Sequence, residues 1–146
     1  MATPPTVVAG ETIAVSWGNA VRDWAAFGEV DGSNTAGSTA LTGTAASVCT
    51  VTLTIPAGWL SWKCAAWASY YSTAGVGNVN EIRLQIDGTD QEVNNIPGDQ
   101  RATTIARRSG MTTTGSRTVV LRAREASGTA GSLNEVFVYA QAMRLT

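Results

Sequence analysis

The stretch Glu81-Ile82-Arg83-Leu84-Gln85-Ile86-Asp87-Gly88, residues 81–88, decides the fold class of this chain. It alternates charged or polar residues with Ile82, Leu84 and Ile86, which is the period of a strand with one buried face. The Asp-Gly dipeptide at its end is typical of a tight turn between antiparallel strands, and residues 89–93 follow it. The stretch therefore predicts a β-hairpin.

Strand patterns recur on both sides of this hairpin. Cys49, Val51, Leu53 and Ile55 alternate with threonines until Pro56. Further alternating runs occupy residues 60–70, 101–108, 117–125 and 135–145, and glycine-containing turns at 109–110, 114–115 and 127–131 divide the later ones. Strands in this number, with no helix among them, predict an all-β fold over residues 48–146, an antiparallel jelly-roll-like sandwich.

Residues 1–30 have a different character. Pro4 and Pro5 favour an extended arm, and Ser16 can cap one short helix over residues 16–26. Two helical turns cannot bury the large apolar side chains of this segment alone. We expect them to anchor the segment on a docking surface, which is the chain's own domain, another copy or a different protein. The anchor residues are Val7, Val8, Ile13, Trp17, Val21, Trp24 and Phe27.

Residues 31–47 consist mainly of glycine, serine, threonine and alanine, with almost no large apolar residue. A stretch of this composition contributes little to a core and is typical of a linker. We therefore expect a flexible connector between the amino-terminal segment and the sandwich.

Two of the expected strands are apolar on both faces. One face of the last strand can line the core, and the small aliphatic residues of the other face permit close approach of a neighbouring strand or subunit. The face with the larger side chains holds Phe137, Tyr139, Met143 and Leu145. The expected oligomer interface comprises Trp59, Trp67, Val136, Val138, Ala140 and Ala142. The alternatives are a central strand within one chain, and stacking of Trp59, Trp67 and Tyr71 on sugar rings.

Composition excludes several function classes. The chain has 146 residues, no histidine and a formal net charge of -1 at pH 7. Without histidine, serine-histidine and cysteine-histidine catalysis and histidine-metal sites are impossible. The near-neutral charge argues against nucleic acid as a partner. No stretch approaches the about 18 apolar residues of a membrane span, and the first residues lack the pattern of a secretory signal. We expect no cofactor, no metal ion, no nucleic acid and no membrane partner.

Charged residues give weak ligand signals. Asp87, Asp90 and Glu92 surround the hairpin turn. They are interpreted as ordinary turn residues, as a calcium site or as the carboxylate pair of a glycosidase. Their spacing matches no EF-hand. Arginines gather in two neighbouring strands, either as a basic patch for an acidic partner or as outward positions paired with glutamates. These arginines are Arg101, Arg107, Arg108, Arg117, Arg122 and Arg124, and the glutamates are Glu81, Glu92, Glu125 and Glu135.

The two cysteines fall on neighbouring expected strands. Cys49 lies opposite Cys64 if Ile55 pairs with Gly58 across the turn at Pro56. That geometry permits a disulfide, but the absence of a secretory signal predicts a reducing cytosol and two buried free thiols.

The opening Thr3-Pro4-Pro5-Thr6-Val7-Val8-Ala9-Gly10-Glu11-Thr12-Ile13, with Trp17-Gly18-Asn19-Ala20-Val21-Arg22-Asp23-Trp24 after it, resembles the amino-terminal segment of small virion proteins of tailed bacteriophages. The stretches Ile82-Arg83-Leu84-Gln85-Ile86-Asp87-Gly88 and Thr118-Val119-Val120-Leu121-Arg122-Ala123 are similar to trimeric jelly rolls of the C1q and tumour-necrosis-factor type. The resemblance implies a structural role, a homotrimer and no catalytic residues.

Three hypotheses follow. The first is a structural virion protein made in the host cytoplasm, a capsid decoration or cement protein that trimerises and binds the major capsid protein or another virion protein through residues 1–30. The second is a tail-fibre or receptor-binding module that contacts host saccharide or protein. The third is a small hydrolase, and we expect no enzyme activity.

Overall fold

The computed structural model describes residues 28–74, 78–127 and 131–145, and every regular element within them is a β-strand. The bounds are β1 Glu29–Ala36, β2 Thr39–Ala40, β3 Ala46–Ile55, β4 Trp62–Thr73, β5 Val79–Ile86, β6 Thr89–Pro97, β7 Gln100–Met111, β8 Gly115–Ser127 and β9 Ser132–Arg144. Among the described residues, no helix has the length and hydropathy that a membrane span requires.

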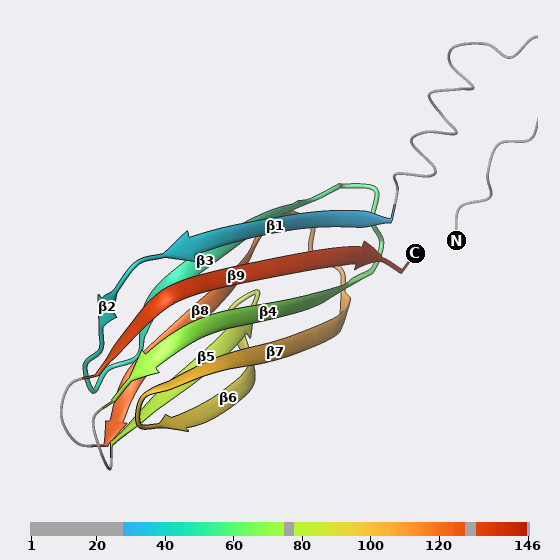
Figure 1. The fold of residues 1–146 in the computed structure, drawn as a ribbon. Helices are drawn as coiled ribbons and strands as arrows, with labels where there is room; N and C mark the ends of the chain where they lie inside the picture. Colours follow the sequence, from blue (N-terminus) through green and yellow to red (C-terminus); the bar gives the residue numbers. More distant parts are fainter. Residues whose placement is uncertain (1–27, 75–77, 128–130, 146) are drawn as a thin grey trace, which may run out of the picture.

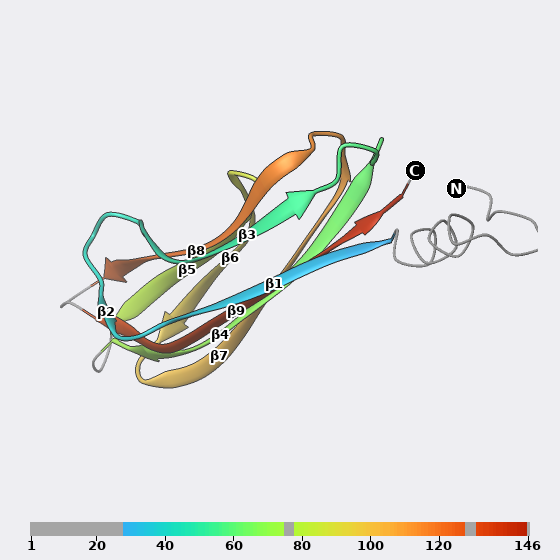
Figure 2. The ribbon, with the colours of Figure 1, turned by 90° about the horizontal axis from the view of Figure 1, so that it is seen from above.

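The strands form two antiparallel sheets (Figure 1). One sheet has the order β1-β9-β4-β7, with the short β2 also paired to β9, and the other has the order β3-β8-β5-β6. Seen from above, the sheets are two layers facing each other (Figure 2). The predicted all-β sandwich is confirmed.

The connectivity is that of a jelly roll. The pairs β5–β6, β4–β7, β3–β8 and β1–β9 are the successive rungs of one long antiparallel ribbon that folds back between β5 and β6. These pairs alternate between the two sheets, so the ribbon wraps around the core. Pairing of β4 with β9 and of β5 with β8 joins the rungs into sheets.

The hairpin that starts this ribbon is the one that the sequence predicts. Ile86 pairs with Thr89, so Asp87 and Gly88 form a two-residue turn. Both have positive φ, 51° and 75°, as a type I′ turn requires. Glycine adopts this conformation without strain, and aspartate tolerates it better than most residues. Ile82, Leu84 and Ile86 are buried, as their alternation predicts.

In the middle of the core, large side chains of one sheet face small side chains of the other. The β3-β8-β5-β6 sheet contributes Val51, Leu53, Leu84 and Leu121. Opposite them, the middle of β4 and β9 contributes small residues, which leave room for these larger side chains at the density of a protein interior. The small buried residues are Cys64, Ala66, Ala68, Val136, Val138, Ala140 and Ala142.

This packing reverses the expected faces of the last strand. Val136, Val138, Ala140 and Ala142 were assigned to an oligomer interface, but each is at most 1% exposed and lies in the chain's own core. A side chain that is buried within its own chain has no surface to give to a partner. Phe137, Tyr139 and Met143 instead occupy the partly exposed face. The expectation was wrong because the large side chains of the opposite sheet fill most of the core, so the small residues of β9 face inward.

The expected connector at residues 31–47 is also wrong, because most of β1, all of β2 and the start of β3 lie in it. Backbone pairing with β9 holds β1 from Glu29 to Ala36, so this strand needs few apolar side chains. A Cβ on Gly32 would lie 3.1 Å from Val51 Cγ1, so glycine lets β1 close over the core. The sandwich therefore begins at Glu29 and not at residue 48. The predicted arm and helix at residues 1–27, including all seven anchor residues, lie outside the described residues.

Trp59 differs from its expected place in the oligomer interface. It is 2% exposed, in the crossover from β3 to β4, where its backbone N–H donates to Pro56 O. Leu60, beside it, is 74% exposed. The crossover is not extended backbone, so strand alternation does not apply to it and the faces were assigned wrongly there.

The cysteines are also arranged differently from the proposed hairpin. Cys49 on β3 and Cys64 on β4 belong to different sheets, because β3 pairs with β8 and not with β4. Both are buried free thiols, as expected.

Candidate functional site: the outer face of the β1-β9-β4-β7 sheet

An apolar row crosses the outer face of this sheet. Ile105 on β7 pairs with Trp67 on β4, and Trp67 pairs with Tyr139 on β9. Ile105 is 59% exposed and Trp67 is 40% exposed. Phe137 lies two residues from Tyr139 on the same face and is half-buried. We call these four residues, Phe137, Tyr139, Trp67 and Ile105, the apolar strip.

The aromatic rings of the strip are ordered by contact. The rings of Trp67 and Tyr139 are stacked, with centroids 4.2 Å apart and planes at 29°. The Tyr139 hydroxyl donates to Asp31 Oδ2 at 3.3 Å. Burial, followed by the nearby carboxylates of Asp31 and Glu29, raises the pKa of this hydroxyl, so Tyr139 is a neutral donor at physiological pH. The stack presents a flat surface that protein or sugar could cover.

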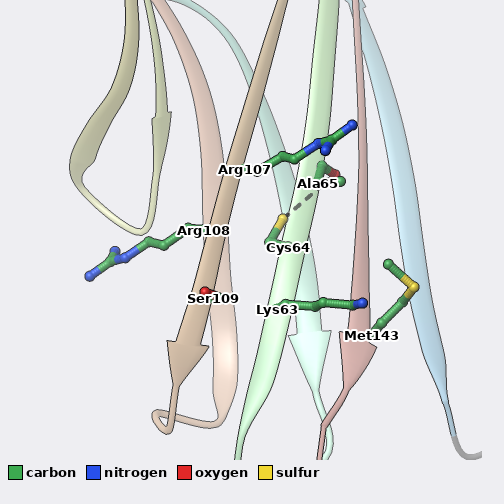
Figure 3. Close-up of a pocket in the computed structure, with 7 residues that line it drawn as sticks. All are labelled: Lys63, Cys64, Ala65, Arg107, Arg108, Ser109 and Met143. Atoms are coloured by element: carbon green, nitrogen blue, oxygen red, sulfur yellow. Dashed lines mark hydrogen bonds between the residues drawn. The ribbon is translucent and has the colours of Figure 1, made fainter.

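A hollow of about 460 Å³ lies beside the strip (Figure 3). A β-bulge shapes it: Trp62 pairs with Met111 and Cys64 with Arg108, so Ser109 and Gly110 stand opposite one residue of β4. Gly110 has a φ of 71°, which suits glycine. The lining residues are Lys63, Cys64, Ala65, Arg107, Arg108, Ser109 and Met143.

The hollow carries positive charge. Lys63 and Arg107 are exposed and extend to the same side of β4 as Met143, whereas Arg108 extends to the other side (Figure 3). Arg108 donates to the carbonyl oxygens of Ile86, at 2.8 Å, and Asp87, at 3.3 Å. In the ranges that the structure describes, no ion pair involves Lys63 or Arg107.

Negative charge lies at the opposite edge of the same face. β1 is an edge strand, and its Glu29 and Asp31 are exposed. Gln141 donates a hydrogen bond to Glu29 Oε1, and Tyr139 donates to Asp31. Both donors are uncharged, so these hydrogen bonds do not neutralise the two carboxylates. The face therefore has an acidic edge, an apolar centre and a basic hollow.

The outer face of the other sheet carries a network of ion pairs. Glu81 Oε1 accepts from Arg83 Nε at 2.6 Å and Arg124 Nε at 3.0 Å, and Arg124 Nη2 lies 2.7 Å from Glu81 Oε2. Arg83 also donates to Asp90, which accepts from Gln85. The hydrogen bonds from Arg124, and then those from Arg83, hold the pKa of Glu81 below its usual range despite burial.

Several predicted site residues are explained by these pairs. The arginine cluster forms ion pairs where Arg124 meets Glu81 and Arg101 meets Glu135, the latter at 2.5 Å, as the paired alternative expects. Asp87 lies 3.4 Å from Arg117 and Asp90 pairs with Arg83, so these carboxylates neutralise arginines. Arg122 donates instead to the backbone oxygen of Ala45.

The proposed sugar-stacking residues do not form one platform. Trp59 is buried, Trp67 stacks on Tyr139, and Tyr71 lies under Arg101, whose Cζ is 5.4 Å from the ring centroid. Sequence reasoning missed Tyr139 and Ile105 as surface residues. The alternation of β9 marks Tyr139 and Phe137 as one face, but only the opposing sheet decides which face is outside.

No protein-family model matches the chain, and no curated protein sequence matches it. Solved structures share its fold. One is that of infectious bursal disease virus Gx strain, at 9% identity and a TM-score of 0.50, covering 80% of this chain and 32% of that one. Another is dimeric latent PorU from Porphyromonas gingivalis, at 12% identity and a TM-score of 0.50, covering 81% and 13%.

A third is the tripod from the baseplate of bacteriophage Tuc2009, at 18% identity and a TM-score of 0.49, covering 99% of this chain and 75% of that one. The two-sheet antiparallel sandwich thus resembles domains in viral and bacterial proteins. At identities this low the likeness shows the fold alone.

Proposed function

We propose that this chain is a structural virion protein of a tailed bacteriophage, a capsid decoration or cement protein. In this proposal three copies associate through the outer face of the β1-β9-β4-β7 sheet. Residues 1–27 attach the trimer to the major capsid protein or another virion protein. The protein is made in the host cytoplasm and resides in the virion.

The apolar strip carries the proposal. A sheet whose outer face meets water normally has polar residues there, as the Glu81 network illustrates on the other sheet. Trp67 and Ile105 expose large apolar side chains at adjacent positions, with Tyr139 and Phe137 beside them. A contiguous apolar patch of this kind marks an interaction surface.

The described residues supply a core without the amino-terminal segment. Buried apolar side chains from both sheets, from Leu41 to Ala142, form one cluster. The chain enters this sandwich at Glu29, the first residue of β1. In this proposal the large apolar residues of positions 1–27 occupy a separate docking surface.

We further propose that the chain is not an enzyme. It has no histidine to act as a base near neutral pH. Glu81, Asp87 and Asp90 are engaged by arginines. Burial raises the pKa of the Cys64 thiol to about 11, so little reactive thiolate forms there at neutral pH.

The alternative is a tail-fibre or receptor-binding module. The exposed Trp67 ring favours it, because an aromatic ring can stack on a sugar ring as well as on protein. In that case the apolar strip would bind host saccharide or protein.

Electron microscopy of purified phage particles tests the proposal. We expect threefold density of the sandwich on the capsid surface, with residues 1–27 against the shell. Density on the tail, together with binding of the chain to host glycans, would favour the alternative. Absence of the chain from purified particles would overturn both virion roles.

A further inference from the structure

We infer that copies of this chain meet head to tail, with the acidic edge of one copy against the basic hollow of the next. The acidic edge is Glu29 and Asp31 on β1, and the basic hollow presents Lys63 and Arg107. The inference rests on the self-association in the proposed function and specifies which surfaces meet.

The register of the sheet separates Asp31 from Arg107 within one chain. Asp31 pairs with Gln141, Gln141 with Ala65, and Ala65 with Arg107, so Asp31 and Arg107 stand at opposite ends of one row. Three inter-strand spacings separate them, about 14 Å in all. Glu29 and Lys63 are closer, since both pair with Met143 of β9. In the part of the chain that the structure describes, no ion pair joins either carboxylate to Lys63 or Arg107, so all four charges are available to a second copy.

The hollow has a shape that can receive the acidic edge. Ala65 occupies the middle of the row between Gln141 and Arg107, and its small side chain leaves space between larger neighbours. Lys63 and Arg107 stand at this space and extend to the same side (Figure 3). Carboxylates from an incoming strand would meet both cations there, and charge-assisted contacts of this kind are stronger than neutral ones.

Charge complementarity selects a second copy as the occupant. One face of one chain carries both halves of the contact, with the apolar strip in the neighbouring row of the same face. The acidic half is on edge strand β1, and Arg107 of the basic half is on edge strand β7. The two halves are different surfaces, so the contact is heterologous, and a heterologous contact that closes forms a ring. The proposed ring has three copies.

Charge reversal tests the pairing in the full-length chain. One variant carries Lys63→Glu and Arg107→Glu, and a second carries Glu29→Lys and Asp31→Lys. Each places like charges in the contact, so we expect association to weaken at least about a hundredfold, measured by sedimentation velocity. A third variant with all four changes restores opposite charges in every contact, and we expect it to recover the wild-type oligomer.

The matched control adds charge to the other sheet. Thr52 and Thr54 are exposed positions of β3, and Thr52→Glu with Thr54→Glu should leave association unchanged. Circular dichroism and thermal unfolding identify any variant that is unfolded. Association of the wild-type chain should weaken as NaCl rises from about 0.05 to 0.3 M, because salt screens exposed charges. This salt series needs no variant.

The outcomes separate the pairing from the proposed function. A wild-type oligomer that survives both reversals, or a four-change variant that stays dissociated, overturns the pairing while self-association stands. An oligomer insensitive to salt also argues against it. A wild-type chain that is monomeric at about 100 μM overturns the self-association itself and leaves the apolar strip to a different protein.

Discussion

Glu81 is a nearly buried carboxylate, 8% exposed, that two guanidinium groups stabilise on the outer face of the β3-β8-β5-β6 sheet. Arg83 and Arg124 both hydrogen bond to it, and the pKa of Glu81 is lowered. A lowered folded-state pKa means that the carboxylate stabilises the fold above the unfolded pKa, about 4.3. This contribution is lost as pH falls through the folded-state pKa.

We predict that Glu81→Gln lowers the free energy of unfolding by about 1 kcal/mol at pH 7. The difference from wild type should shrink as the pH falls below about 4, since wild-type Glu81 then becomes neutral too. Urea unfolding at pH 7 and pH 3 measures both differences. An equal loss at the two pH values would show that charge is not the cause.

The two thiols are protected by burial. Cys49 and Cys64 are 5% and 2% exposed, and burial raises the pKa of both, that of Cys64 to about 11. Thiolate is the reactive form, and it is scarce far below the pKa.

We therefore predict that a thiol reagent at pH 8 labels folded protein slowly and urea-unfolded protein at least about a hundredfold faster. Single variants Cys49→Ser and Cys64→Ser assign each rate to one thiol. Rapid labelling of Cys64 in the folded protein would contradict its burial.

At the scale of elements, β9 has two apolar faces with different roles. Ala140 on β9 is buried against the opposite sheet, whereas Ala65 on the outer face of the neighbouring strand β4 lies in the hollow. The same substitution at these two positions therefore distinguishes the core face from the outer face.

We predict that Ala140→Leu destabilises the fold by about 1 to 3 kcal/mol, because the core has no space for three more carbons. At a protein concentration low enough for the chain to be monomeric, Ala65→Leu should change the free energy of unfolding by less than about 0.5 kcal/mol. Chemical denaturation of both variants gives the comparison. A larger cost at Ala65 would mean that the faces are assigned wrongly.

The amino-terminal segment is the second element with a test of its own. Deleting residues 1–27 stops just before β1, and we predict that the sandwich stays folded while attachment to particles is lost. Trp17→Ala and Trp24→Ala should each weaken attachment about thirtyfold, the cost typical of a tryptophan hot spot, and Arg22→Ala should weaken it less. Full decoration by the truncated chain would exclude this anchor, and an unfolded truncation would place the segment in the core.

At the scale of the whole molecule, the two outer faces of the sandwich differ in kind. One carries a network of ion pairs around Glu81, and the other carries the apolar strip beside opposite charges. An assembly that covers the strip binds only the folded chain, so association adds to stability in proportion to the logarithm of concentration.

We predict that the melting temperature of the full chain rises when protein concentration increases from about 1 to 100 μM. Trp67→Ser, which removes the exposed ring at the centre of the strip, should reduce this rise. Differential scanning fluorimetry across the concentration series measures it. A melting temperature independent of concentration would argue against self-association.

The sequence by itself determined the hairpin at Asp87-Gly88, most of the long strands and the sandwich class. Period-two alternation depends only on local backbone geometry, and an Asp-Gly turn depends only on two residues. Each of these signals is contained in a few consecutive residues, so no distant partner is needed to interpret it.

Only the tertiary structure decided which face of β9 is buried, that β1 is a strand, and where the hollow forms. Alternation in β9 separates Val138 and Ala140 from Phe137 and Tyr139, but both sets are apolar, so hydropathy cannot choose between them. The choice comes from the large side chains of the opposite sheet, which leave room for small partners. Backbone pairing with β9 makes a strand of β1, and the bulge at Ser109 and Gly110 sets the register that shapes the hollow. These are contacts between residues far apart in the chain, and no local pattern encodes them.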